Sequence, residues 1–129
     1  MLATNGSPSV KHPYDARAYK GIRFWAKAAS SIQVRVRLPL RDTTANALGT
    51  KCSGSNCEDH YLKVQVIGTS WGVYELAWPD GTSNNGFAQG NWGLQTTFDA
   101  ATLIGVQFLV NAGVPSADIW IDDVSFIPK

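Results

Sequence analysis

The segment from Ser31 to Leu40 (SIQVRVRLPL) constrains the fold most, because apolar and polar residues alternate along its whole length. An extended chain places successive side chains on opposite faces. The apolar face would carry Ile32, Val34, Val36 and Leu38, and the polar face Gln33, Arg35 and Arg37. The segment therefore predicts a strand with one buried and one open face. The open face is either a recognition surface or the ordinary solvated face of an antiparallel sheet.

Five further segments have the composition of strands, and turn-forming residues separate them. They are Gly21–Ala28, His60–Gly68, Trp71–Trp78, Thr102–Asn111 and Ala117–Pro128. Helical periodicity is almost absent, apart from a single turn expected at Asp15–Tyr19 with Asp15 as its cap. Several short strands with Gly, Pro and Asn turns predict an all-β protein, an antiparallel two-sheet β-sandwich.

The chain of 129 residues is long enough for one domain with its own core. Residues 1–13 are rich in Ser, Pro, Gly and Asn and lack periodicity, so we expect a flexible lead or linker there, with an edge strand as the alternative. Residues 14–129 form the expected sandwich domain. The two long polar loops, 41–59 and 79–93, are of the length usually found in pinned or functional loops.

Charge and hydropathy exclude several partners. The net charge is +1, only 16% of residues are charged, and no run of Lys or Arg forms a basic patch, so we expect no nucleic-acid binding. Apolar runs are too short to cross a membrane, so no membrane partner is expected. The first residues lack a secretion signal, which places such a signal upstream or makes the chain an internal module with an added Met1.

Cys52 and Cys57 lie five positions apart in KCSGSNCED. A disulfide is the favoured interpretation, because Ser53 and Gly54 let the short loop close. Zinc is the alternative, but His60 is the only nearby His, and further ligands at suitable spacing are missing. A disulfide implies an oxidising, extracellular location.

Three segments together carry a resemblance to a known family. They are YDARAYKGIRFWAKA (Tyr14–Ala28), FDAATLIGVQFLV (Phe98–Val110) and DIWIDDVSF (Asp118–Phe126). Between the first two lie the step Asp59-His60-Tyr61 after the cysteine loop and a Ser-Trp-x-x-Tyr step from Ser70. In this order the segments resemble the galactose-binding-like jelly-roll modules that occur as carbohydrate-binding modules on bacterial plant-cell-wall hydrolases.

The resemblance implies a non-catalytic β-sandwich that binds sugar on the concave face of one sheet and carries a structural calcium ion. It also implies a covalently attached glycoside hydrolase domain as partner. The chain departs from the pattern at its start, where such modules have several dozen residues before the Tyr-Asp segment. We therefore expect a truncated module, or one that completes an unpaired sheet edge with a second copy as a homodimer.

Sugars are bound by planar polar side chains that reach hydroxyl groups and by aromatic rings that stack on C–H faces. On the jelly-roll interpretation, the strands 31–40 and 102–111 are neighbours. Their shared open face would carry Arg35, Arg37, Gln107 and Asn111, extended by Gln33 and Gln65. Trp92, in the polar loop segment GNWG, is the expected stacking platform. Trp25 points away from Phe24, which places it on an open face or under the other layer.

Asp122 and Asp123 are consecutive, so on a regular strand one of them would point inward and need a partner or a metal ion. By resemblance, Asp122 is the expected calcium ligand. The alternative is a carboxylate paired with a basic side chain or with backbone N–H groups.

Catalysis is not expected. No pair of carboxylates suits a glycosidase, no G-x-S-x-G segment occurs, and His60 is expected to pack within a loop. The expected function is a secreted carbohydrate-binding module that brings a hydrolase to plant-cell-wall polysaccharide of the β-glucan (cellulose included), xylan or mannan type. The alternative is a protein-interaction or assembly domain of the same superfamily, which would show a contiguous apolar patch instead of polar planar groups.

Overall fold

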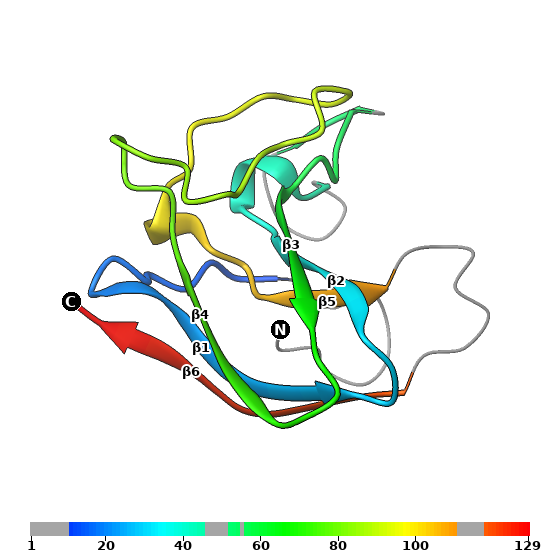
Figure 1. The fold of residues 1–129 in the computed structure, drawn as a ribbon. Coiled ribbons are helices and arrows are strands. Elements are labelled where there is room, and N and C mark those ends of the chain that lie inside the picture. Colours follow the sequence, from blue (N-terminus) through cyan, green and yellow to red (C-terminus); the bar gives the residue numbers. More distant parts are fainter. Residues whose placement is uncertain (1–10, 46–51, 55, 111–117) are drawn as a thin grey trace.

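The computed structural model describes residues 11–45, 52–54, 56–110 and 118–129, and this part contains two three-stranded antiparallel sheets (Figure 1). The strands are β1 (Tyr19–Ala28), β2 (Ile32–Leu38), β3 (Tyr61–Ile67), β4 (Gly72–Ala77), β5 (Gln107–Val110) and β6 (Ile119–Pro128). One sheet has the order β4-β1-β6 and the other has the order β3-β2-β5. Short 3-10 turns occur at Arg41–Thr43 and Ala100–Thr102. The predicted two-sheet β-sandwich is confirmed.

The core lies between the two sheets and follows from the alternation in the central strands. β1 turns Ile22, Phe24 and Ala26 inward, and β2 turns Val34 and Val36 inward. Phe24 meets Phe108 of the opposite sheet edge-on, with the ring centroids 5.0 Å apart. Each inward residue removes apolar surface from water, which is the main stabilising term for a sandwich of this size.

The fifth strand is shorter than the sequence predicts. Its expected first residue, Thr102, belongs to a 3-10 turn in which the Asp99 carboxylate accepts a hydrogen bond from the Ala101 N–H at 3.0 Å. Leu103 then makes isolated bridges with Tyr14 and Leu40 before β5 begins. Over its own length β5 pairs with β2, as the sequence predicted.

A β-bulge in β6 overturns one prediction. Trp25 pairs with Asp122 whereas Arg23 pairs with Ser125, so β6 has one residue more than β1 over this interval. Asp123 takes up the extra residue with φ of 51°. Both aspartates are therefore exposed, and the prediction that one of them points into the core is wrong.

A short turn precedes β1. In place of the expected helical turn, a β-turn runs from Ala16 to Tyr19 and is closed by the Tyr19 N–H donating to the Ala16 carbonyl. The Asp15 carboxylate accepts the Arg17 N–H beside it. Among the residues that the structure describes, no helix is long and apolar enough to span a membrane.

Candidate functional site

The open face of β2 is flanked by side chains from both neighbouring strands. Residues that pair directly across an antiparallel sheet share a face. Arg37 lies between Leu62 and Gln107, and Arg35 lies between Val64 and Leu109. The structure thus brings Arg35, Arg37 and Gln107 together on one surface.

Gln33 lies one row further along the same face, beside the exposed Val66. Gln65 pairs with the buried Val34 and so belongs to the other face, which corrects its expected place beside Gln33. Asn111 lies outside the described residues.

A pocket of about 650 Å³ opens over this face. The sheet supplies one wall, the 58–60 segment a second, and the 88–92 segment a third. Its lining residues are Arg35, Arg37, Glu58, Asp59, His60, Leu62, Val64, Ala88, Gln89, Gly90 and Trp92. Trp92 is 60% exposed, so two guanidinium groups and an accessible indole border the same cavity.

Asp59 fixes the loop that carries Trp92. Its buried carboxylate accepts hydrogen bonds from the Gly90 N–H at 2.6 Å, the Gly93 N–H at 3.0 Å and the Gln95 side-chain amide at 3.0 Å. Burial acts to raise the pKa of Asp59, but these donors together outweigh it and hold that pKa below its ordinary value. The loop is therefore bound around a charged, buried acceptor.

Two glycines let the loop approach this carboxylate. A Cβ at Gly93 would lie 2.6 Å from the Asn56 carbonyl oxygen and 2.7 Å from the Asp59 Cβ. A Cβ at Gly90 would lie 2.7 Å from Cδ1 of Trp92, so the indole rests against the bare backbone of Gly90. Close packing thus requires the two glycines of the segment GNWG.

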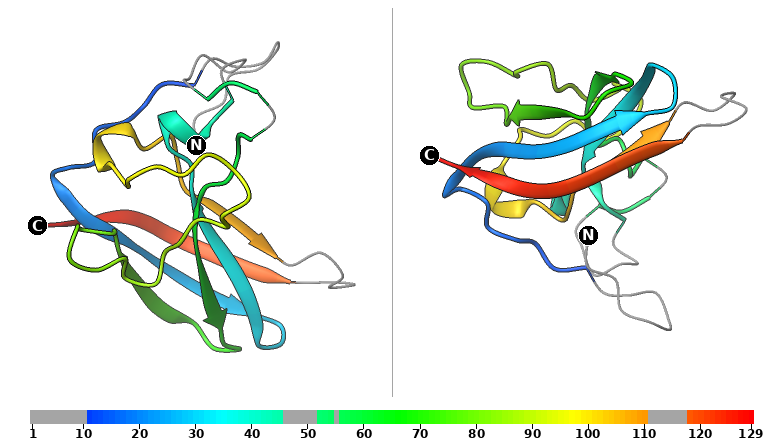
Figure 2. Two further views of the ribbon diagram at one scale, coloured as in Figure 1. Left: turned by 90° about the horizontal axis from the view of Figure 1, so that it is seen from above. Right: turned by 60° about the horizontal axis from the view of Figure 1, so that its bottom comes forward.

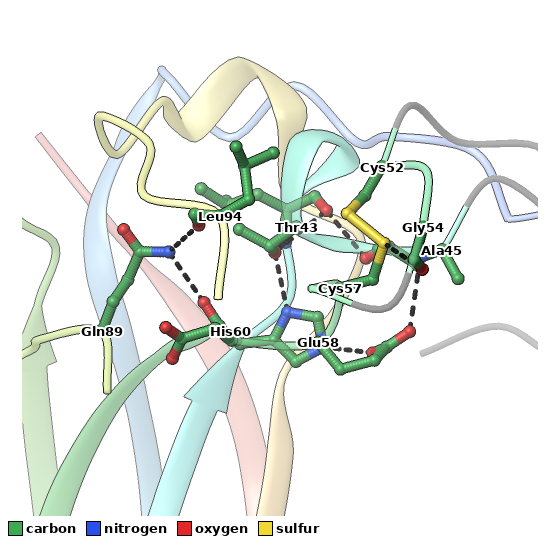
Figure 3. Close-up of a disulfide and its surroundings, with 12 residues drawn as sticks. Thr43, Ala45, Cys52, Gly54, Cys57, Glu58, His60, Gln89 and Leu94 are labelled. Carbon is green, nitrogen blue, oxygen red and sulfur yellow. Dashed lines mark hydrogen bonds and ion pairs between the residues drawn. A yellow bond between two sulfur atoms is a disulfide. The ribbon is translucent and has the colours of Figure 1, made fainter. Parts of the chain in front are cut away.

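Gln89 holds the same loop from its other side. Its amide nitrogen donates to the Asp59 carbonyl at 2.8 Å and to the Leu94 carbonyl at 2.9 Å (Figure 3). Its amide oxygen accepts the Thr96 N–H at 2.9 Å. All three bonds join the loop to itself or to the start of β3. The position of Trp92 is consequently set by a network of buried or half-buried partners.

The disulfide between Cys52 and Cys57 is confirmed, with the two Cα atoms 5.7 Å apart. It anchors the segment that leads to Glu58 (Figure 3). Glu58 has φ of 78°, which is uncommon for a residue with a side chain and marks local strain beside the pocket.

His60 connects this segment to the turn after β2 (Figure 3). Its Nδ1 lies 2.7 Å from the Thr43 hydroxyl, and its Nε2 lies 2.6 Å from the Glu58 carboxylate. Burial lowers the pKa of His60, and the Glu58 carboxylate offsets this only in part. The neutral ring then donates from Nε2 to Glu58 and accepts from Thr43 at Nδ1.

The order hydroxyl, imidazole and carboxylate resembles a catalytic triad, but the hydroxyl cannot meet a substrate. Thr43 is 1% exposed, and its Oγ1 is already occupied by the backbone of Leu40, from which it accepts an N–H at 3.1 Å. The network therefore fastens the pocket wall and presents no accessible nucleophile.

The two arginines differ in how they are held. Arg37 donates from Nη2 to the Glu58 carbonyl at the long distance of 3.5 Å. Within the described part of the chain, no hydrogen bond or ion pair engages the side chain of Arg35. The donors of Arg35 are thus available to a molecule in the pocket.

The remaining predicted residues lie elsewhere. Trp25 is exposed on the outer face of the other sheet, so it does not share a site with Arg35. Asp122 lies beside it, and its carboxylate accepts the Asp123 N–H at 2.8 Å. No group of three or more His, Cys, Asp or Glu in the described residues could hold a metal ion. Asp122 is not part of such a group, and a bound calcium ion stays a prediction.

Sequence reasoning missed the supporting residues, Glu58, Asp59 and Gln89. The run Cys-Glu-Asp-His directly before a strand was the available signal, because its ionisable residues lie between a cysteine expected in a disulfide and a predicted strand. Comparison with protein-family models, with curated proteins and with solved structures gave no match for this chain.

Proposed function

We propose that the chain is a non-catalytic carbohydrate-binding module whose ligand occupies the pocket between the β2 face and the Trp92 loop. The observation that carries the proposal is the pairing of an unengaged arginine with an accessible indole in one cavity. A guanidinium donates hydrogen bonds to ring hydroxyl groups in the plane of a sugar. An indole offers a flat apolar surface to the C–H face of the same ring.

The floor of the pocket favours a glycan chain over a single sugar. Arg37 and Gln107 share one row of the sheet, Arg35 lies in the next row, and Trp92 borders the pocket over the two arginines. A series of donors along a sheet suits several sugar units in succession. Plant-cell-wall polysaccharides of the β-glucan, xylan or mannan type are the proposed ligands, and a secreted protein with an attached hydrolase domain is the proposed context.

The test is native affinity electrophoresis in gels that contain soluble β-glucan, xyloglucan, xylan, mannan or pectin, each with and without chelator. We expect one class of glycan to retard the protein. Arg35→Ala and Trp92→Ala should each weaken binding about tenfold or more, the loss of one charged hydrogen bond or one stacking contact. Arg17→Ala is the matched control, because Arg17 is exposed and bonds only its neighbour Asp15.

Two results would contradict the proposal. One is a folded protein that no glycan retards. The other is retardation that both Arg35→Ala and Trp92→Ala leave unchanged, which would move the ligand away from this pocket. The chelator arm tests the calcium expectation separately, since loss of binding on chelation would require a metal ion.

A further inference from the structure

The outer face of the β4-β1-β6 sheet carries a row of two exposed indoles with a lysine between them. Lys27 of β1 pairs directly with Trp120 of β6, and Trp71 immediately precedes β4 on the other side. The Lys27 ammonium lies 5.0 Å from the Trp120 ring centroid and 5.3 Å from that of Trp71. Both tryptophans are 46% exposed.

A third indole extends this surface into the next row. Trp25 is 41% exposed and lies between the exposed Val73 and Asp122. The row after that is charged, since Arg23 bonds the Glu75 carboxylate at 2.6 Å. The right-hand view of Figure 2 shows the side of the molecule on which this sheet lies. We call Trp25, Lys27, Trp71 and Trp120 the tryptophan platform.

The platform is not explained by packing within the chain. The inner face of the same sheet is filled by residues such as Ile22, Phe24 and Leu76, so the indoles do not complete the core. Leaving three large aromatic side chains in water forgoes the stabilisation that their burial would give. Contiguous exposed aromatic surface in a small domain marks a place where a partner binds.

The charge on the platform argues against a second copy of the chain as that partner. A two-fold interface places each patch against itself. Lys27 lies at the centre of the indole row, so a symmetric contact would bring two ammonium groups together, with Asp122 of each copy close by. A glycan instead offers hydroxyl oxygens to the ammonium and C–H faces to the indoles.

The spacing of the indoles indicates the length of the ligand. Trp71 and Trp120 flank β1 on its two sides, and two inter-strand distances amount to roughly 9.6 Å. One sugar ring does not cover both indoles, whereas an extended chain lying across the strands does. We propose that the tryptophan platform is a second glycan-binding surface, specific for a polysaccharide chain and separate from the Trp92 pocket. This inference rests on the proposed carbohydrate-binding function.

The two proposed glycan-binding surfaces lie on opposite sheets, which lets one molecule bind two polysaccharide chains. The β2 face and the platform are the outer faces of the two layers, so they point away from each other (Figure 1). One molecule then holds two polysaccharide chains and cross-links them. Short oligosaccharides, which occupy one site at a time, do not become cross-linked.

The experiment compares wild type with Trp120→Ala, Trp71→Ala, Trp92→Ala and the double variant Trp92→Ala/Trp120→Ala. Val124→Ala is the control, because it truncates a half-exposed apolar side chain of β6 that borders a separate hollow beside Tyr14 and Phe126. Circular dichroism establishes that each variant is folded. Affinity is measured by depletion onto the glycan that retards wild type, and cross-linking is measured as turbidity of a dilute solution of that polymer.

We expect Trp120→Ala and Trp71→Ala to lose cross-linking and about tenfold in polymer affinity, the value of one stacking contact, while retaining oligosaccharide binding through the Trp92 pocket. The double variant should bind the polymer about a hundredfold more weakly than wild type, because the two tenfold losses multiply. If both platform variants cross-link and bind as wild type does, the platform inference is wrong and the proposed function stands. If wild type binds no glycan, both are wrong. A wild-type dimer in sedimentation velocity that Trp120→Ala dissociates would also overturn the inference, since a second copy would then cover the platform.

Discussion

At the scale of single residues, buried polar side chains determine the shape of the candidate pocket. Asp59 and His60 are consecutive, yet they bind different segments: Asp59 holds the loop with Gly90 and Gly93, and His60 reaches the turn at Thr43. Because a buried polar group needs its partners, each of these side chains ties its segment to the start of β3. The arginines and Trp92, which face the pocket, do not have to stabilise it.

His60 gives this part of the protein a predictable pH dependence. Burial lowers its folded-state pKa below the ordinary value of 6.5. Above that value the ring is neutral in both folded and unfolded chains, so its contribution to stability is complete. As the pH falls below 6.5, the unfolded chain binds a proton first, and the folded state loses stability by at most about 1.4 kcal/mol per pH unit.

Urea unfolding at neutral pH and at mildly acidic pH measures this loss. His60→Gln, which does not titrate, should remove most of the difference between the two conditions, and His12→Gln, at an exposed position, should leave it in place. A titration of the His60 ring by NMR that gave a pKa above 6.5 would contradict the argument.

At the scale of the element, the bulge in β6 decides which residues the outer face presents. Without the extra residue at Asp123, the alternation that points Ile121 inward would also point Asp123 inward and displace Phe126 from the core. The bulge restores Phe126 to the inner face, where it stacks on Tyr19 with ring centroids 4.8 Å apart. It also interrupts a strand that forms a sheet edge in the described residues, which disfavours pairing with another chain. A homodimer through that edge stays a prediction.

Substitutions at Asp123 test the bulge. Asp123→Val places a β-branched side chain at φ of 51° and should lower the free energy of unfolding by about 1–2 kcal/mol. Asp123→Gly adopts the same backbone without strain and should stay within about 0.5 kcal/mol of wild type. Ser125→Val is the control, since Ser125 pairs regularly with Arg23 and strands accept valine. Equal stability of the two Asp123 variants in chemical denaturation would show that the positive φ is not required.

At the scale of the whole molecule, the sequence pattern predicted the two-sheet sandwich correctly. It predicted side-chain positions incorrectly where one extra residue changes the register of a strand. Period-2 alternation was enough for the sandwich, and the jelly-roll interpretation correctly made the strands of Arg35, Arg37 and Gln107 neighbours. Alternation placed Asp122 and Asp123 incorrectly, because a one-residue bulge leaves no trace in the hydrophobic pattern. The contacts of Asp59 join positions more than thirty residues apart, and no local pattern reports such pairs.

The tryptophans show the same limit. Alternation correctly predicted that Trp25 points away from Phe24. It does not predict to which of the two sheets the strand belongs. The structure places Trp71 and Trp120 on the outer face beside Lys27, a position that alternation within their own strands does not predict. Only the pairing of β1 with its two neighbours brings the three indoles together.

The low net charge of the molecule predicts that its affinity for a glycan depends little on ionic strength. The net charge of +1 creates little long-range field, and the cations at the two proposed glycan surfaces, Arg35 and Lys27, act through short-range hydrogen bonds. For a neutral polysaccharide, affinity should therefore change by less than about twofold between low salt and about 0.3 M sodium chloride, measured by depletion isotherms. Stacking on Trp92 is insensitive to salt, so Arg35→Ala should show the same flat dependence at lower affinity. A steep loss of affinity with salt that Arg35→Ala abolishes would mean that the ligand carries negative charge, and would replace a neutral glycan by an acidic one.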